Sequence, residues 1–457
     1  MIAVVRELGA WLVPLMLLAA TAALVWVWLT GRPRLALLLL LVGLPLHTVF
    51  FQVASVYLPG WLESGLRLWR EALLLALCVA IVLQWSGVWP AIRRHWLVGL
   101  VLVLYAITLL VGVGRGASTR VALSALRLAA VPLLVFACAL AVPYGGRDLE
   151  RAIPWLLGVG VIVCGFALYQ GYVLGPGFLW TYYAQGGRLA HAYEVGGSPV
   201  QRLMGTFSSP NQLSLYLVFL AMISASLFMM GRRPRLAYVG LGALYVLVLV
   251  LTVSRSGWAA LAVGGALLLL LWWHRWEIWA ALAGLGILGL VAMAQRGLLV
   301  RLRDLVSLQE VSAAHHVSMA WKNLQTIASE PWGSGLGSAG PLAQAAEAAG
   351  LIQARHPTES YLLQIGLQQG WPGLAAFGLL IGLVAAGLLR GLRRSSTPLG
   401  RAVTLAALAC LAGAVVHGVM NVDLQDIGVQ SYLWFLVAMG LRMPGLEHGQ
   451  PARGAHA

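Results

Sequence analysis

The chain has 457 residues, of which 60% are apolar and only 10% are charged. A soluble protein carries roughly 25% charged residues, so this composition excludes both an ordinary soluble enzyme and a disordered chain. The apolar residues form long blocks, several of about 18 residues or more, which is enough to cross a hydrocarbon core of roughly 30 Å. The sequence therefore predicts an all-α protein that crosses the membrane many times.

The formal net charge of +15 does not indicate a nucleic-acid binder, because the basic residues form short runs between apolar blocks instead of one soluble basic face. All of the basic residues except Lys322 are arginines, so an arginine is informative only through its place in the chain. The four cysteines lie far apart inside apolar blocks and indicate neither a disulfide framework nor a metal cluster.

The apolar blocks predict about 12–13 transmembrane helices and a long, partly helical external loop. The expected spans are 10–29, 35–57, 68–85, 96–113, 121–142, 152–174, 210–230, 236–254, 257–272, 277–294, 371–389, 402–420 and 428–442. We expect one integral membrane domain with N-terminal helices (1–174), a middle group (210–294) and a C-terminal group with a cytoplasmic tail (371–457). Two long external loops, 175–209 and 295–370, separate these groups.

Every second connection between spans is basic, and basic connections are typical of the cytoplasmic side. They contain Arg32, Arg34, Arg93, Arg94, Arg147, Arg151, Arg232, Arg233, Arg235, Arg275, Arg390, Arg393, Arg394, Arg401 and Arg442. This pattern places the C-terminus inside, and the loops 175–209 and 295–370 and the turn 421–426 outside. Because long loops in compact proteins are usually functional, we expect the chemistry on the external face of the plasma membrane.

The stretch 236–271 is almost unbroken apolar sequence, interrupted only around residues 254–257. As one helix it would be about 54 Å long, nearly twice the membrane thickness. Both of its ends carry basic residues of the cytoplasmic kind, so we expect a tight helical hairpin with Arg255 at its outer tip. At that depth Arg255 either faces a bound phosphate group or snorkels to the phospholipid headgroups.

The loop before the next helix carries the signature of a helix N-terminus. Ser209 and Gln212 have the spacing of a capping box, and Pro210 falls at the first helical position. The free N–H groups and the dipole of such a helix start favour an anion. Arg202 lies shortly upstream and would add a positive charge, and the alternative is a plain helix start with a solvated arginine.

A second helix start is expected near His356. Pro357 at the first helical position would make His356 the cap residue and place Glu359 at the third position, where its carboxylate can reach back to the cap N–H. The helix dipole would then lower the pKa of His356 and leave a neutral imidazole, which a general base needs. This short helix, from 357 to about 369, is expected to be interrupted by the stretch 368–373, before the next span. An exposed cap for His356 and capping alone for Glu359 are the alternatives.

Five further residues carry polar groups in or near apolar sequence. Arg120 and Arg127 lie seven residues apart on one helix face, and Arg127 is about two turns inside its span, where a charge is a functional candidate. His47 lies within another span and is expected to be a hydrogen-bonded packing residue. The adjacent His315 and His316 have no well-spaced carboxylate beside them, so we expect no metal site.

In four motifs, the sequence resembles the O-antigen ligase and O-antigen polymerase superfamily, whose members are membrane glycosyltransferases of the GT-C type. The residues that carry the resemblance are Arg202, Gly205, Thr206, Phe207, Pro210 and Asn211, then Ser254, Arg255 and Ser256, then Trp321, Pro331, Gly333, Gly335 and Gly337, and finally His356, Tyr361, Leu362, Gly370, Pro372 and Gly373. Each motif alone is loose, but all four occur in order and on one predicted side of the membrane.

The resemblance implies transfer of a glycan from an undecaprenyl diphosphate carrier to an acceptor such as lipid A–core, on the periplasmic face of the inner membrane. It implies catalytic roles for Arg202, Arg255 and His356. The residues expected to bind substrate are Arg120, Arg127, Asn211 and Glu359. The expected reaction inverts the anomeric centre and uses neither a metal nor another cofactor. The expected partners are the lipid-linked glycan, the acceptor and membrane lipids, with no nucleic acid.

Other functions stay open at this point. A polymerase of O-antigen or exopolysaccharide, or a protein O-oligosaccharyltransferase, would use the same donor with a different acceptor. A flippase or other transporter for lipid-linked oligosaccharides would place its basic residues deep along a central cavity, whereas here only Arg127 lies clearly within a span. A non-catalytic scaffold would not need His356 on the same rim as Arg202 and Arg255.

Overall fold

A computed structural model describes most of the chain. The described residues are 33–58, 65–83, 93–116, 118–142, 144, 146–175, 202–231, 234–271, 311–353 and 356–448. Regular structure in these ranges consists of 13 α-helices, one π-helical turn and one 3₁₀ turn, without strands. The predicted all-α class is therefore confirmed.

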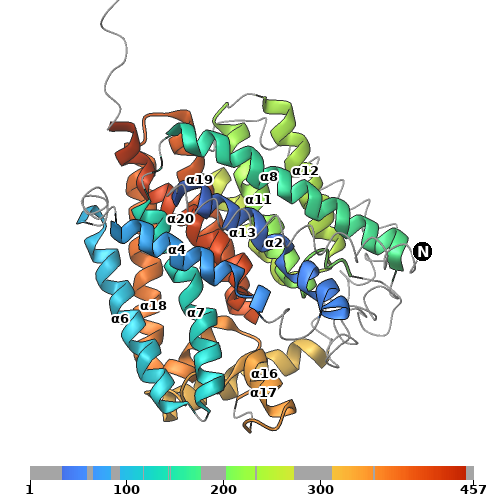
Figure 1. Cartoon of the computed structure of the whole chain (residues 1–457), viewed down its shortest axis with the longest axis vertical. Coiled ribbons are helices and arrows are strands. Elements are labelled where there is room, and N and C mark those ends of the chain that lie inside the picture. The colour runs from blue at the N-terminus through green and yellow to red at the C-terminus, as the bar shows by residue number, and fades with distance from the viewer. Residues whose placement is uncertain are drawn as a thin grey trace, which may run out of the picture.

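The α-helices follow one another along the chain in the order shown in Figure 1. They are α2 (Pro33–Tyr57), α4 (Trp69–Leu83), α6 (Trp96–Arg115), α7 (Thr119–Ala141), α8 (Gly146–Tyr169), α11 (Pro210–Met229), α12 (Arg235–Leu251), α13 (Arg255–Leu271), α16 (Val311–Ser329), α17 (Gly340–Ala348), α18 (Tyr361–Arg394), α19 (Pro398–Met420) and α20 (Ile427–His448). The turns are η1 (Gln170–Leu174) and η2 (Val422–Gln425).

Helices lie at all of the expected spans within the described residues, and the spans expected at 10–29 and 277–294 fall outside them. In the described part, seven helices are long and apolar enough to cross a membrane, and α12 and α13 are shorter apolar helices. Large apolar side chains remain exposed on several of these helices: Leu75, Leu110, Ile162 and Leu270 are each at least 58% exposed. Such faces suit contact with lipid.

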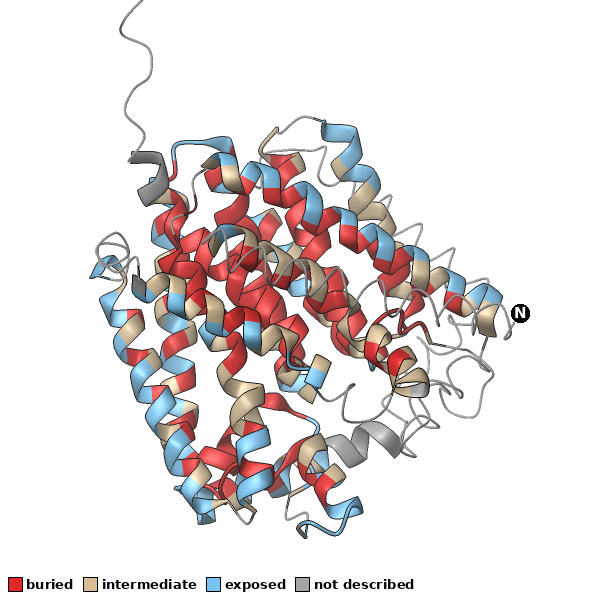
Figure 2. Ribbon diagram, viewed as in Figure 1, coloured by how far each residue is buried: buried red, intermediate tan, exposed pale blue. Residues whose placement is uncertain are grey.

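The centre of the bundle is formed by α11, α19 and α20, which Figure 2 shows as largely buried. These helices are apolar on all sides, as expected for helices surrounded by other helices. α12 packs mainly on α11, and α13 packs mainly on α19. The pair α6 and α18 lies side by side at the left of Figure 1.

The helical hairpin predicted at 236–271 is confirmed, with α12 and α13 as its arms and residues 252–254 as its tip. Each arm packs on a different neighbour more than on the other arm. The tip contains Val253, whose φ of 53° lies in the left-handed region that β-branched residues seldom adopt. Arg255 is the first residue of α13, directly after the tip.

The segment that precedes α18 differs from the sequence prediction. The helix begins at Tyr361, and Ser360 caps it by accepting a hydrogen bond from the Leu363 N–H at 3.4 Å. The predicted start at Pro357 is therefore wrong. Ser360 is the cap because its hydroxyl both accepts this bond and donates to the Gly418 carbonyl. His356 lies before the helix, in extended chain.

α18 is broken within the predicted interruption 368–373, at Gly370, where φ is 68° and ψ is −161°. The break receives the loop that follows α16: the Trp371 N–H donates to the Pro331 carbonyl at 2.9 Å. A Cβ on Gly370 would lie 2.1 Å from that carbonyl oxygen, so only glycine fits here. The break thus gives the loop 331–339 a fixed place against α18.

Candidate active site

Arg202 joins three segments that are distant in sequence. Its Nε donates to the Thr252 carbonyl at 3.0 Å, and one terminal nitrogen donates to Asn211 Oδ1 at 2.9 Å. The same Asn211 oxygen accepts a bond from Ser254 Oγ at 2.9 Å. The loop before α11, the first turn of α11 and the hairpin tip are therefore held together around one guanidinium.

The electrostatic surroundings of Arg202 combine burial with two nearby charges. Burial lowers the pKa of Arg202 to about 10, the nearby Asp423 carboxylate opposes this effect, and the positive charge of Arg255 adds to it. Arg202 consequently remains protonated at neutral pH. Two guanidiniums close enough to influence each other form a centre suited to a group with two or more negative charges.

Ser209 caps α11, as predicted, and accepts a hydrogen bond from the Gln212 N–H at 3.1 Å. The reciprocal half of the predicted capping box is wrong in one detail. Gln212 Oε1 accepts from Ser208, from its hydroxyl at 2.7 Å, and not from Ser209. The reason is Asp423, which accepts from Ser209 Oγ at 3.0 Å and from the Gln212 amide at 3.2 Å and thereby holds both side chains.

Asp423 lies in the turn between α19 and α20. Its partial burial raises the pKa of the carboxyl, while hydrogen bonds from Asn211 and Ser209 act in the opposite direction. Its negative charge acts on Arg202 and favours the protonated guanidinium. The sequence showed this residue only as part of an acidic turn, since its partners come from α11, more than 200 positions away.

His356 lies in extended chain, where its backbone forms a parallel bridge with Ala339. Its Nε2 lies 3.1 Å from Ser334 Oγ. The following residue is also fixed, because Asn323 of α16 donates to the Pro357 carbonyl at 3.1 Å. Since α18 starts five residues further on, Glu359 is exposed ahead of the Ser360 cap, and the expected effect of a helix dipole on His356 does not apply.

The turn 421–426 connects the histidine segment with the arginine centre. The Tyr361 N–H donates to the Asn421 carbonyl at 3.3 Å, and the Gln364 amide donates to Gln425 Oε1 at 2.9 Å. On its other side, the turn places Asp423 against the start of α11. The turn thus contacts the start of α11, next to Asn211, and the start of α18, just after His356. Arg202 and the hairpin tip are joined to it indirectly, through Asn211.

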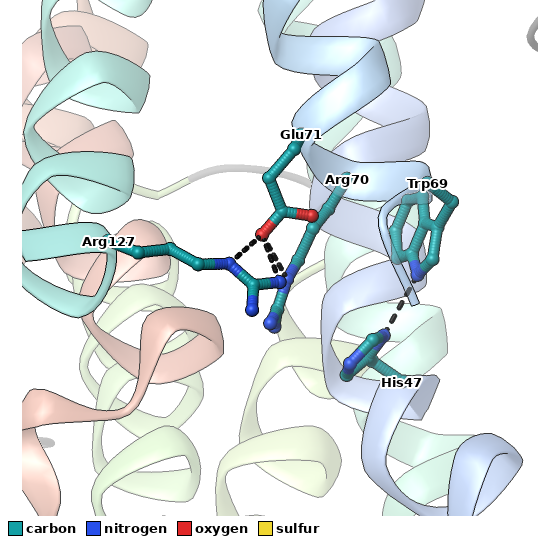
Figure 3. A network of polar contacts seen from close by, with 5 residues as sticks. All are labelled: His47, Trp69, Arg70, Glu71 and Arg127. Carbon is teal, nitrogen blue, oxygen red and sulfur yellow. Dashed lines mark hydrogen bonds and ion pairs between the residues drawn. The ribbon is translucent and has the colours of Figure 1, made fainter. Parts of the chain in front are cut away.

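Arg127 has a different environment. Its Nε donates to Glu71 Oε1 of α4 at 2.7 Å, and Arg70 Nε donates to the same oxygen at 3.1 Å (Figure 3). His47, next to this network, accepts a bond from the Trp69 indole at 2.8 Å and is the hydrogen-bonded packing residue that we expected. Arg120 is exposed in the first turn of α7. A substrate role for Arg120 and Arg127 stays a prediction.

The model of the O-antigen ligase family matches residues 240–378. This range includes Arg255, Ser334 and His356 and excludes Arg202, Asn211 and Asp423. No curated protein matches the chain. The resemblance that the motifs indicated is confirmed over the matched range. Residues 240–378, from within α12 to within α18, therefore match the O-antigen ligase family.

Proposed function

We propose that the protein transfers a glycan from an undecaprenyl diphosphate carrier to a lipid A–core or similar acceptor, on the external face of the plasma membrane. The observation that carries this proposal is the arginine centre. Arg202 and Arg255 are close enough for their charges to interact, and the hairpin tip and Asn211 hold Arg202 in a partly buried place.

The arginine centre fits the leaving group of this reaction. As the bond between the sugar and the diphosphate breaks, negative charge grows on the diphosphate oxygens. Two fixed guanidiniums in a partly dehydrated site can stabilise that charge without having to reorient. At about 4 Å and an effective dielectric constant of about 20, each contact would contribute on the order of 4 kcal/mol before the cost of dehydration.

His356 supplies the base in this proposal. The imidazole takes the proton of the acceptor hydroxyl, and the hydroxyl oxygen forms a bond to the anomeric carbon. The bond from that carbon to the diphosphate oxygen breaks at the same time, and its electron pair leaves with the diphosphate. Direct displacement inverts the anomeric centre. A positioned general base contributes typically about 100- to 10,000-fold to the rate.

The test uses purified protein in lipid nanodiscs, with a defined undecaprenyl diphosphate-linked glycan and purified lipid A–core. Arg202→Ala, Arg255→Ala and His356→Asn should each remove most glycan transfer, and Arg→Lys should recover only part of it, because an ammonium lacks the two-pronged donor geometry. Arg393→Ala, at an exposed arginine near the other end of α18, is the matched control and should keep full activity.

Near wild-type turnover in both arginine-to-alanine variants would contradict the proposal. Three other results would each identify a different function. Elongation of the lipid-linked glycan without lipid A–core would identify a polymerase, and transfer to an added periplasmic protein would identify a protein-directed transferase. Movement of the donor between leaflets without any transfer would identify a flippase.

A further inference from the structure

A carboxylate lies behind the ring of His356, one hydroxyl away. Ser334 Oγ donates to Glu330 Oε2 at 2.5 Å and lies 3.1 Å from His356 Nε2. The three side chains therefore form a continuous row of hydrogen bonds, from the first residue after α16 to the extended segment before α18. None of the motifs in the sequence analysis singled out Glu330 or Ser334 for a chemical role.

The count of protons in this row determines the tautomer of the imidazole. A serine hydroxyl has one proton to donate. Because Ser334 donates that proton to Glu330, its oxygen must accept the hydrogen bond from His356, and Nε2 is the protonated nitrogen. In the neutral ring the lone pair then lies on Nδ1, which is the nitrogen able to take a proton.

The backbone around Ser334 is fixed by contacts that do not involve the row. The Ser334 N–H donates to the Leu367 carbonyl at 2.8 Å, and the Gly335 N–H donates to the Gln368 carbonyl at 3.1 Å. Gly335 has a φ of 94°, and a Cβ there would lie 2.5 Å from the backbone of Arg115. The serine is buried, so the hydroxyl has little freedom to turn away from its two partners.

We propose that Glu330 and Ser334 are positioning residues, which hold His356 in the tautomer that accepts the acceptor's proton on Nδ1 and stabilise the imidazolium that forms. This inference rests on the proposed role of His356 as the base. When Nδ1 takes the proton, the ring becomes positive while Nε2 keeps its bond to Ser334. The Glu330 carboxylate, held by the same serine, then faces the new charge and lowers its energy.

The first experiment measures His356 itself and needs no turnover. Protein labelled with ¹⁵N-histidine is titrated by NMR, and His356→Asn identifies the signal. In the wild type, the neutral ring should carry its proton on Nε2. In Glu330→Gln and in Ser334→Ala, the measured pKa of His356 should fall by about 0.5 to 1, because a carboxylate favours the charged ring and Glu330 is exposed enough for water to weaken the effect.

The second experiment measures glycan transfer over a range of pH. Glu330→Gln and Ser334→Ala should each lower the plateau rate about 10- to 100-fold, as typical for a group that orients a reacting residue. The acid limb of the profile should move to lower pH together with the pKa of His356. The double variant should be no slower than the slower single variant, since both changes interrupt one row. Glu347→Gln, at an exposed glutamate of α17, is the matched control and should change neither property.

An unchanged pKa and tautomer of His356 in both variants would overturn the inference, and so would additive rate losses in the double variant. A fully active His356→Asn would instead overturn the proposed role of His356, and the NMR titration would separate the two cases. Glu330→Asp separates loss of the carboxylate from misfolding. Its side chain is one methylene shorter but still carries a carboxylate, so the pKa of His356 should fall less in Glu330→Asp than in Glu330→Gln.

Discussion

At the scale of single residues, the guanidinium of Arg202 donates its hydrogen bonds to neutral acceptors. Its nitrogens contact the Thr252 carbonyl and the Asn211 amide oxygen, and the carboxylate of Asp423 acts on it from nearby. Neutral acceptors orient a guanidinium without cancelling its charge. This arrangement keeps the positive potential of the arginine centre available for a diphosphate.

Asn211 is therefore expected to set the affinity for the donor. Asn211→Asp keeps the shape of the side chain but adds a negative charge beside Arg202. It should raise the dissociation constant for undecaprenyl diphosphate at least about tenfold, since one unit charge at about 4 Å corresponds to several kcal/mol before screening. Isothermal titration in nanodiscs would measure this constant.

Asn211→Ser is the control for that change, because it keeps an oxygen acceptor without a charge. It should bind the donor within about threefold of the wild type, which corresponds to less than about 1 kcal/mol. Equal affinities of the aspartate and serine variants would show that the charge balance at Arg202 does not govern donor binding.

Residue-scale predictions from the sequence succeeded where a local rule applied. Ser209 and Pro210 mark the start of α11 because capping depends on positions three residues apart. The same rule misled at His356, since proline also fits extended chain, and the better cap, Ser360, lay four residues further on. The roles of Ser334 and Asp423 depend on partners brought in by the fold, so no local pattern could identify them.

At the scale of elements, two unusual backbone positions shape the site end of the bundle. One is the hairpin tip with Val253, and the other is the break in α18 at Gly370. The hairpin could be predicted because 36 apolar residues are too long for one span. The sequence could not predict that the two arms pack on different helices, because α13 packs on α19, which is distant in sequence.

The break at Gly370 gives a test of how much the loop 331–339 depends on α18. Gly370→Ala combines an unfavourable positive φ with a Cβ placed against the Pro331 carbonyl. We expect a loss of about 1–3 kcal/mol of stability, as for other overpacked positions, together with a clear loss of glycan transfer. Thermal unfolding and the transfer assay measure the two effects.

Gly378→Ala is the matched control on the same helix. A Cβ there meets nothing within 4 Å, and the backbone is helical. It should leave stability and transfer unchanged or slightly improved. If both alanine variants behaved alike, the docking of the loop against the break would not be important for the site.

At the scale of the whole molecule, the sequence predicted the helices well and their packing poorly. Length and hydropathy identify a span because a membrane has a defined thickness. They do not show which spans lie at the centre, because lipid tails are as apolar as a protein core and a buried face looks like a lipid-facing one. The central positions of α11, α19 and α20 therefore emerged only from the structure.

The orientation of the whole bundle is open to direct measurement. The alternation of basic connections predicts the loop 295–370 outside and residues 390–401 inside. A cysteine at the exposed Gln344, in a chain without its four native cysteines, should react with an impermeant maleimide added to intact cells. A cysteine at the exposed Arg393 should react only after the cells are lysed. The reverse pattern would invert the orientation.

The turn 421–426 is the last segment of the site to leave the ribosome. The start of α11 and the start of α18 are synthesised earlier, but the turn can bond to both only when α19 and α20 have been made. A growing chain consequently contains the arginine centre before the segment of His356 can bond to the turn. Competence for transfer should then appear at a late step of biogenesis, so that an unfinished chain does not consume the lipid-linked glycans around it.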